Sequence, residues 1–292
     1  MNSPACVVAL REEAGLGPRT LWRLLSRFGS AENILATASS VLQKVPGIGP
    51  DRAQRIVSAA ERLPAVHARL ASVARRGIAL VTAFDAAYPA RLRRLPDAPP
   101  LLYARGDLPP EDRPCIAVVG AHQASAEGLE SAARWAGSLA RRGVVIVSGL
   151  AAGIDAAGHR AAIEAGGLTV AVVGSGLDRI GPAENLPLAR QIPRSGALLS
   201  EVPPQTPASV GRLLARNRIV VGMSDLVLIV EARINAGGTM DAAGRALKAR
   251  IPLCAVRDPA FPANERLLAR GAQPVPPDPD PDALISLITP PG

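Results

Sequence analysis

Two stretches of the sequence decide the fold: Cys115-Ile116-Ala117-Val118-Val119-Gly120 and Val144-Val145-Ile146-Val147-Ser148-Gly149. Each is a short run of mostly β-branched residues that ends in glycine, and a helix-length segment separates the two. Comparable apolar runs follow at residues 169–173, 197–199, 226–230 and 252–256. Buried strands that alternate with helices are typical of a parallel sheet covered on both faces. We therefore predict an α/β fold, an extended Rossmann-like, doubly wound and mostly parallel sheet, over residues 113–276.

The first 60 residues contain an internal repeat. Its two copies begin with Gly15-Leu16-Gly17-Pro18 and Gly47-Ile48-Gly49-Pro50, and apolar residues at helical spacing follow each copy. This pattern resembles a doubled, SAM-like helix-hairpin-helix module, whose glycines leave N–H groups at a helix N-terminus free to hold a phosphate. We predict a small all-α domain over residues 1–75. Gly47, Gly49 and Arg52 form a candidate DNA site in it, second to the site predicted below for the parallel sheet. The alternative is a helical packing domain that touches no DNA.

The remaining segments are expected to be short. Residues 76–112 form a connector that packs on the Rossmann-like domain, and residues 277–292 form a C-terminal tail with a short helix. No apolar run reaches the roughly 20 residues of a membrane helix, and the first residues lack a signal-peptide pattern. Three scattered cysteines give neither a disulfide framework nor metal-ligand spacing. A cytoplasmic protein without metal or membrane contact is the expectation.

The charge of the chain favours an anionic partner. The formal net charge is +8, and residues 1–80 alone carry 11 basic and 5 acidic side chains. An arginine-rich composition also fits a GC-rich genome, so the charge is mild support for nucleic acid. The sequence has two tryptophans, two tyrosines and three phenylalanines, which are too few aromatic rings to form a platform on which bases stack. DNA would therefore be bound mainly through its phosphates.

Small and polar residues follow the predicted strands. In open α/β sheets, ligands bind outside the carboxyl ends of the strands, and small residues there let backbone N–H groups approach an anion. We predict an anion site along this edge that takes a polynucleotide and performs no catalysis. The residues expected to contact DNA are Gly120, His122, Gln123, Ser125, Gly153, Asn185, Arg216, Arg218, Gly238 and Thr239.

The order of several short motifs resembles the DNA-processing protein A (DprA/Smf) family over roughly residues 85–275. These motifs are Tyr88-Pro89, Val118-Val119-Gly120, Ser148-Gly149-Leu150-Ala151, Gly153-Ile154-Asp155, Gly176-Leu177-Asp178, Ser200-Glu201, Arg216-Asn217-Arg218-Ile219, Val230-Glu231-Ala232 and Arg270-Gly271-Ala272. The resemblance implies a cytoplasmic homodimer without a cofactor. It would bind single-stranded DNA, protect incoming DNA in natural transformation, and load the RecA recombinase onto it. The sequence ends soon after Ile288, so we do not expect the C-terminal winged helix of many family members.

Two positions depart from the family pattern. The family usually has Gly-Ser/Thr-Arg after the first strand, where this chain has Gly120-Ala121-His122, and an arginine in the second loop, where this chain has Ala152. Arginine supplies a fixed charge and a forked donor set for phosphate, whereas histidine offers at most a partial charge and alanine none. Either Arg216 and Arg218 compensate, or this is a paralogue with weakened DNA binding.

Enzymatic alternatives have less support. The sequence has no Gly-Lys-Ser/Thr phosphate loop, no Gly-x-Ser-x-Gly elbow and no histidine spacing for a metal. Gly237-Gly238-Thr239 resembles the phosphate loop of nucleoside-monophosphate phosphoribohydrolases, but Asp241 stands near the position of their glutamate. A nucleotide-binding module and a purely structural protein also stay open. Four acidic residues at strand ends are interpreted as capping groups or partners of arginines: Asp155, Asp178, Glu201 and Glu231.

Overall fold

The structure is a computed structural model that describes residues 2–233 and 237–288. The chain forms two compact units. The first comprises Met1–Tyr88 and Leu92–Tyr103, and the second comprises Pro89–Arg91 and Ala104–Gly292. Most of the segment expected to be a connector therefore belongs to the first unit, and its packing on the Rossmann-like domain stays a prediction. Within the described residues, no helix is both long and apolar enough to cross a membrane.

The first unit is mainly helical, as the repeat predicts. Pro18 and Pro50 occupy the first positions of α2 and α5, where a missing N–H group costs nothing. The glycines that open the two copies, Gly15 and Gly47, have φ values of +67° and +83°, which a β-carbon would strain. The elements are α1 (Pro4–Val8), a π-helical turn (Ala9–Glu13), α2 (Pro18–Phe28), α3 (Ala31–Ala36), α4 (Ser39–Leu42), α5 (Pro50–Glu61), α6 (Leu63–Arg75), β1 (Ala79–Thr82) and the first residues of β2 (Leu101–Gly106).

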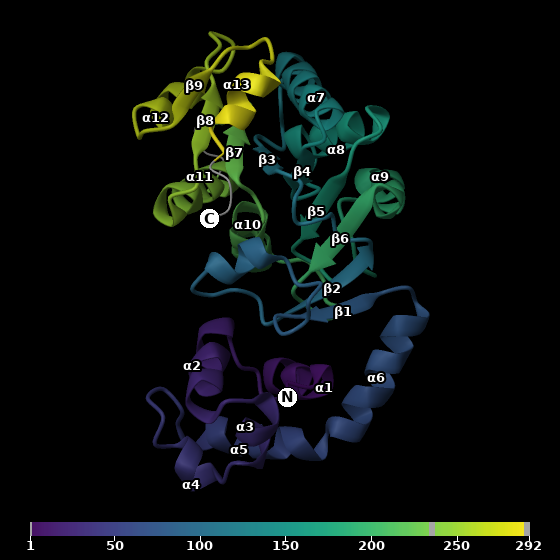
Figure 1. The fold of residues 1–292 in the computed structure, drawn as a ribbon, viewed down its shortest axis with the longest axis vertical. Coiled ribbons are helices and arrows are strands. Elements are labelled where there is room, and N and C mark those ends of the chain that lie inside the picture. The colour runs from purple at the N-terminus through teal and green to yellow at the C-terminus, as the bar shows by residue number, and fades with distance from the viewer. Residues whose placement is uncertain (1, 234–236, 289–292) are drawn as a thin grey trace. The chain divides into compact units, whose positions relative to one another are not determined.

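The second unit alternates strands and helices around a parallel sheet (Figure 1). The sheet order within this unit is β6-β5-β4-β3-β7-β8-β9, and every paired strand runs parallel to its neighbour. The elements are β3 (Cys115–Val119), α7 (Ala126–Arg141), β4 (Val145–Ser148), α8 (Ile154–Glu164), β5 (Thr169–Val173), α9 (Leu186–Gln191), β6 (Gly196–Ser200), α10 (Val210–Gly222), β7 (Leu226–Ile229), α11 (Gly237–Ala249), β8 (Leu253–Val256), α12 (Glu265–Leu268), β9 (Gln273–Val275) and α13 (Pro281–Ser286).

Helices cover both faces of this sheet. On one face, alternate strand residues such as Ile116, Ile146 and Leu228 pack with Trp135 of α7 and Ile154 of α8, because successive side chains of a strand point to opposite sides. On the other face, α10 and α11 pack against each other and against β5, β7 and β8. All six predicted apolar runs form strands. The predicted α/β fold with a doubly wound parallel sheet is confirmed.

The strand order creates a switch point beside β3. The chain moves outward from β3 through β4, β5 and β6, then returns to the other side of β3 and continues through β7, β8 and β9. The loops after β3 and β7 therefore diverge at the carboxyl edge of the sheet. In folds of this kind such a divergence opens a crevice.

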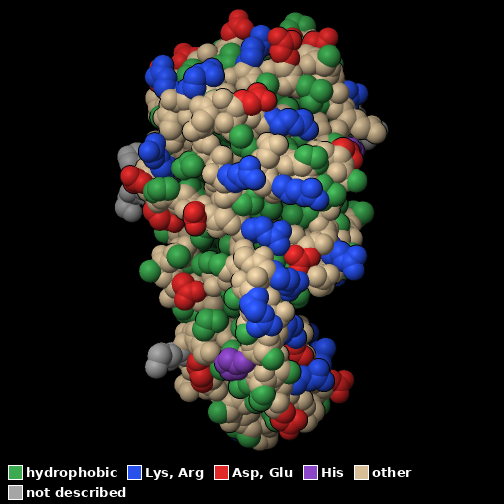
Figure 2. Space-filling model, turned by 90° about the vertical axis from the view of Figure 1, so that its right-hand side faces the viewer, with side chains coloured by type: hydrophobic (Ala, Val, Ile, Leu, Met, Phe, Trp, Pro, Cys, Tyr) green, Lys and Arg blue, Asp and Glu red, His purple; other side chains and the backbone are tan. Residues whose placement is uncertain are grey.

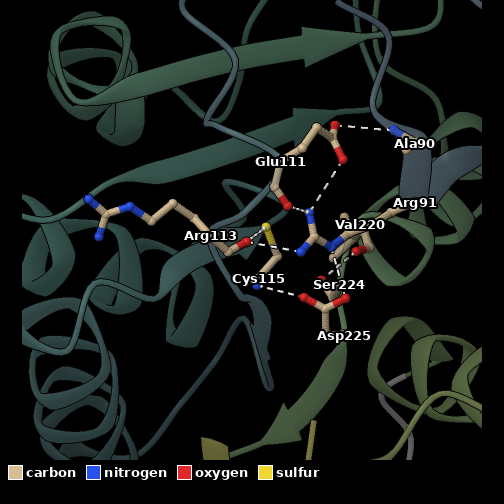
Figure 3. Close-up of polar contacts among 8 residues, drawn as sticks. All are labelled: Ala90, Arg91, Glu111, Arg113, Cys115, Val220, Ser224 and Asp225. Carbon is tan, nitrogen blue, oxygen red and sulfur yellow. Dashed lines mark hydrogen bonds and ion pairs between the residues drawn. The ribbon is translucent and has the colours of Figure 1, made fainter. Parts of the chain in front are cut away.

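A buried ion pair joins the start of the second unit to the residue that precedes β7, at the amino-terminal end of this central strand (Figure 3). Arg91 Nε donates to Asp225 Oδ1 at 2.8 Å, and Arg91 Nη2 donates to the carbonyl of Arg113 at 2.9 Å. The other carboxylate oxygen of Asp225 accepts from the Cys115 amide at 2.9 Å. Arg91 thus joins the segment before β3 to the α10–β7 turn, and these contacts raise its pKa against the opposing effect of burial.

Candidate nucleic-acid interface

Two cavities open side by side at the carboxyl ends of β3 and β7, and His122 lines both of them. The larger has a volume of about 640 Å³ and runs from the β3 loop to residues 260–263. The smaller, of about 80 Å³, lies between the β3 and β4 loops, α10 and the start of α11. Of the residues predicted to contact DNA, the structure brings seven to these cavities: Gly120, His122, Gln123, Ser125, Arg216, Gly238 and Thr239.

Two predicted glycines serve close backbone packing. A β-carbon on Gly120 would lie 2.5 Å from Cγ1 of Ile154. Gly153 has a φ of +74°, and a β-carbon there would lie 2.3 Å from the carbonyl oxygen of Ala121. No larger residue fits either position without a shift of the backbone. The glycines therefore hold the β3 loop tightly against the start of α8.

A buried pair of opposite charges, Arg216 and Asp155, forms the floor of the smaller cavity. Arg216 is 9% exposed, and a β-carbon on Gly149 would lie 1.3 Å from its Nη1, so only glycine leaves room for this guanidinium. Burial raises the pKa of Asp155, and the attraction of Arg216 opposes that rise. Among the described residues, Arg216 Nε has no hydrogen-bond partner. At least one donor of this guanidinium is therefore left unsatisfied by the described part of the protein.

Most backbone N–H groups expected to form an anion cradle already have partners inside the protein. The amides of Gly149 and Ala151 donate to Asp155 Oδ2 at 3.0 and 3.4 Å. The amide of Ala121 donates to the carbonyl of Glu231. These three amides are therefore not free to approach an anion, because buried carboxylate and carbonyl oxygens satisfy them first. Over the described part of the chain, the His122 and Gln123 amides have no such acceptor.

Ser125 is a helix cap rather than a free ligand group. Its Oγ accepts from the Gly128 amide at 3.0 Å and donates to Glu231 Oε2 at 3.0 Å, and its own amide donates to the same oxygen at 2.8 Å. Capping of this kind fixes the first turn of α7. His122 and Gln123, in contrast, are exposed at the rim of the larger cavity. These two side chains are placed to reach a ligand.

Arg218 and Asn185 lie outside the lining of both cavities. Arg218 is 7% exposed and forms an ion pair with Glu201 Oε1 at 2.7 Å. Asn185 is buried and donates from Nδ2 to the carbonyl of Leu150 at 3.1 Å. Their predicted DNA contacts are untested, and the observed partners suit residues that hold loops in place. The acidic residues interpreted as caps or arginine partners make such contacts: Asp155, Asp178, Glu201 and Glu231.

Sequence reasoning did not identify the far wall of the larger cavity. Ala260, Phe261, Pro262 and Ala263 form this wall. They follow β8 in a segment that contains no glycine cluster, so no motif indicated them. Phe261 itself is buried in the core of the unit.

The candidate second DNA site in the first unit has an accessible backbone at Gly49, whereas the Arg52 side chain already has a partner within the protein. A β-carbon on Gly49 would meet nothing within 4 Å, so the backbone at this turn is accessible. Arg52 Nη1 donates to the carbonyl of Gly47 at 2.7 Å. The arginine therefore braces the hairpin turn, and its predicted contact with DNA stays untested.

Comparisons with known proteins agree with this architecture. Residues 79–284 match the family described as DNA recombination-mediator protein A, and residues 12–62 match a SAM-like helix-hairpin-helix tandem. The chain is 34% identical over 239 residues to Protein Smf of Synechocystis, covering 80% of this chain and 60% of that relative. It therefore spans less than two thirds of that protein's length.

Two solved structures are similar. The structure of DNA processing protein A (DprA) from Streptococcus pneumoniae superposes with a TM-score of 0.83 and 26% identity, over 98% of each chain. DNA processing protein A from Helicobacter pylori, whose structure is described for its single-stranded DNA binding mode, superposes with a TM-score of 0.63 and 28% identity, over 72% of this chain and 94% of that one. The chain belongs to the DNA recombination-mediator protein A family, that of the DprA and Smf proteins.

Proposed function

We propose that this protein binds single-stranded DNA at the carboxyl edge of its parallel sheet, protects it, and passes it to the RecA recombinase in natural transformation. Three points support the proposal. The chain belongs to a family of recombination mediators, the Helicobacter pylori relative is described for binding single strands, and the two cavities lie where open α/β sheets bind anions.

The observation that carries the proposal is the shared rim at His122. A groove that takes a polymer must continue past one binding residue, and two adjoining cavities with a common wall provide such continuity. This continuous groove is lined by the exposed side chains of His122 and Gln123 and by the glycines that begin α11. The N-terminus of a helix favours an anion. The phosphate backbone is the part of DNA that this surface suits.

We propose no catalytic role for the site. Asp241 stands where the related phosphoribohydrolases have a glutamate, but its carboxylate accepts from Asn217 Nδ2 at 3.0 Å and from Arg245 Nε at 2.8 Å. A general base must lie within hydrogen-bond reach of the proton that it removes, and this carboxylate oxygen already has two partners inside the protein. Incubation of the pure protein with nucleoside monophosphates should release no free base, and release of base would establish the enzymatic alternative.

A glycine-to-glutamate substitution tests the site directly. A β-carbon on Gly238 meets nothing within 4 Å, and a carboxylate in the first turn of a helix is tolerated or stabilising. Gly238→Glu should therefore fold normally while it places a negative charge at the smaller cavity. The matched control is Gly244→Glu, because Gly244 lies on the same helix, has equally open space and lines neither of the two cavities at the sheet edge.

The measurement is fluorescence anisotropy with labelled oligo-dT and with a duplex of equal length, across a salt series. Wild type should prefer the single strand and lose affinity as salt rises. Gly238→Glu should weaken binding at least tenfold, and Gly244→Glu should leave it within about twofold, as a remote exposed charge contributes little. Equal affinities for both variants would place DNA elsewhere, and no binding by wild type would refute the proposal.

Three further parts of the proposal need separate assays. RecA loading should appear as faster RecA ATP hydrolysis on DNA coated with single-strand-binding protein. A homodimer should appear as twice the chain mass in light scattering. A second DNA contact through Gly47, Gly49 and Arg52 should appear as a loss of affinity in Gly49→Glu, since that turn has open space.

A further inference from the structure

A third cavity of the Rossmann-like unit is lined by four arginines. Its volume is about 790 Å³, and it lies between the end of β2, the loop after β5, and α9 with the turn that follows. Arg105, Arg179, Arg190 and Arg194 contribute to its wall, with Asp178 as the one acidic lining residue. We call this cavity the arginine cleft. On the face that carries α8 and α9, Figure 2 shows basic side chains gathered among hydrophobic ones.

Three of these arginines form no ion pair within the part of the chain that the structure describes. Arg105 is engaged, since its Nη2 lies 3.0 Å from Asp178 Oδ1 and its Nη1 donates to the carbonyl of Leu177. Gln205 takes the other oxygen of Asp178. Arg179, Arg190 and Arg194 are exposed, and within the described residues no carboxylate lies within 4.0 Å of their guanidinium groups. Three fixed positive charges therefore face the cleft without an internal counter-charge.

The floor of the cleft is apolar. Leu177, Ile180, Ala189 and Pro193 line it, and Leu186 remains 36% exposed at its edge. A ligand that binds both the arginines and the apolar floor carries negative charge on one side and flat apolar faces on the other. Nucleotides in a single strand have this character, because their phosphates are charged and their bases can stack on guanidinium planes. A duplex would hide the base faces.

Asn185 links the cleft to the edge where the proposed DNA site lies. It immediately precedes Leu186 of the cleft and donates to the carbonyl of Leu150 in the β4 loop. The next residue of that loop, Ala151, lines the smaller cavity. A strand leaving the sheet edge past the β4 loop therefore meets the cleft next. The positions expected to supply phosphate charge at the edge, His122 and Ala152, lack arginine.

We propose that the arginine cleft is a second phosphate-binding site for single-stranded DNA, which holds the strand as it leaves the sheet edge. The inference rests on the proposed function. It assigns most of the salt-dependent binding to Arg179, Arg190 and Arg194, outside the strand-end loops.

The test compares two triple variants in the oligo-dT salt series. The cleft variant carries Arg179→Gln, Arg190→Gln and Arg194→Gln. The control carries Arg141→Gln, Lys248→Gln and Arg250→Gln, which remove the same charge at the C-terminal ends of α7 and α11. All six residues are exposed, so both proteins should fold, and circular dichroism and thermal melting verify this.

Each phosphate contact on a single strand contributes about 0.7 to the slope of log K against log salt. The cleft variant should therefore lose about 2 units of slope, and the control should lose less than about 0.5. Similar losses in both triple variants, or no loss in the cleft variant, would overturn the cleft. If Gly238→Glu weakens binding while the cleft variant does not, the proposed function stands and only this inference fails. If wild type binds no oligo-dT, both fail.

Discussion

The exposed imidazole of His122 offers a direct test of the proposed DNA path along the sheet edge. His122 stands where the resemblance leads us to expect arginine, and it lines both cavities at the sheet edge. The adjoining cavity of about 640 Å³ leaves room for a longer side chain. His122→Arg would therefore place a permanent charge and a forked donor set at the rim without repacking the core.

The expected gain follows from two opposing contributions. A hydrogen bond to a charged group contributes about 1.5–3 kcal/mol, and ordering an exposed, flexible side chain costs about 0.5–1.5 kcal/mol. The net gain is about 1–2 kcal/mol, which corresponds to roughly 5- to 30-fold tighter binding. One added phosphate contact should also steepen the salt slope by about 0.7.

The assay is the same oligo-dT titration, with Glu130→Gln as the control. Glu130 is exposed on α7, outside both cavities, and its substitution raises the formal net charge from +8 by the same one unit. Tighter binding and a steeper slope in His122→Arg alone would support a phosphate path past residue 122. An equal gain in both variants would mean that overall charge is responsible, and no change in His122→Arg would exclude DNA from this rim.

Three further predictions concern the Rossmann-like unit. Arg91→Met should leave the buried carboxylate of Asp225 without its main partner and cost about 3 kcal/mol of unfolding free energy; a loss below 1 kcal/mol in urea melts would contradict the fastening role. Burial lowers the pKa of His159 to about 3, so below the ordinary value of 6.5 the unfolded chain takes up a proton that the folded one refuses. The free energy of unfolding should therefore decrease as the pH is lowered below 6.5, by about 2 kcal/mol at pH 5. His159→Asn should remove this decrease, and identical pH profiles for wild type and variant would refute the explanation. Burial raises the pKa of Cys254 to about 12, so this thiol should react with a disulfide reagent only after unfolding, and labelling of the native protein would contradict that.

The parallel sheet was predictable because its strands are buried on both faces. Such strands appear in a sequence as continuous β-branched runs, and the run at 169–173 matches β5 to the residue. The edge strand β9 gives no such signal. It has only three residues, two of them exposed, and includes Pro274, which an edge position tolerates. Only its pairing with β8 makes it a strand, and pairing is a tertiary property.

The location of the candidate site was predictable, but its internal chemistry was not. Glycines at strand ends indicate the correct edge whether they face a ligand or the protein. The structure separates these two uses: Gly238 has open space, while Gly120 and Gly149 are closely packed. The sequence also does not show that Asp155 would take the amides of the β4 loop. Even a hydrogen bond between near neighbours in the chain depends on how the side chain is packed, which the sequence pattern does not encode.

The distribution of charge gives the site its character. At the sheet edge, Arg216 shares burial with Asp155, and Arg218 is paired with Glu201. Such pairs fix geometry, but they attract DNA weakly because their own counter-charges cancel them at a distance. Long-range attraction must then come from exposed, unpaired cations. The three free arginines of the cleft meet this requirement. A protein of this design would orient a strand with its buried groups and capture it with charges placed beside them, so mutations in the cleft should change the salt dependence of binding more than mutations at the sheet edge do.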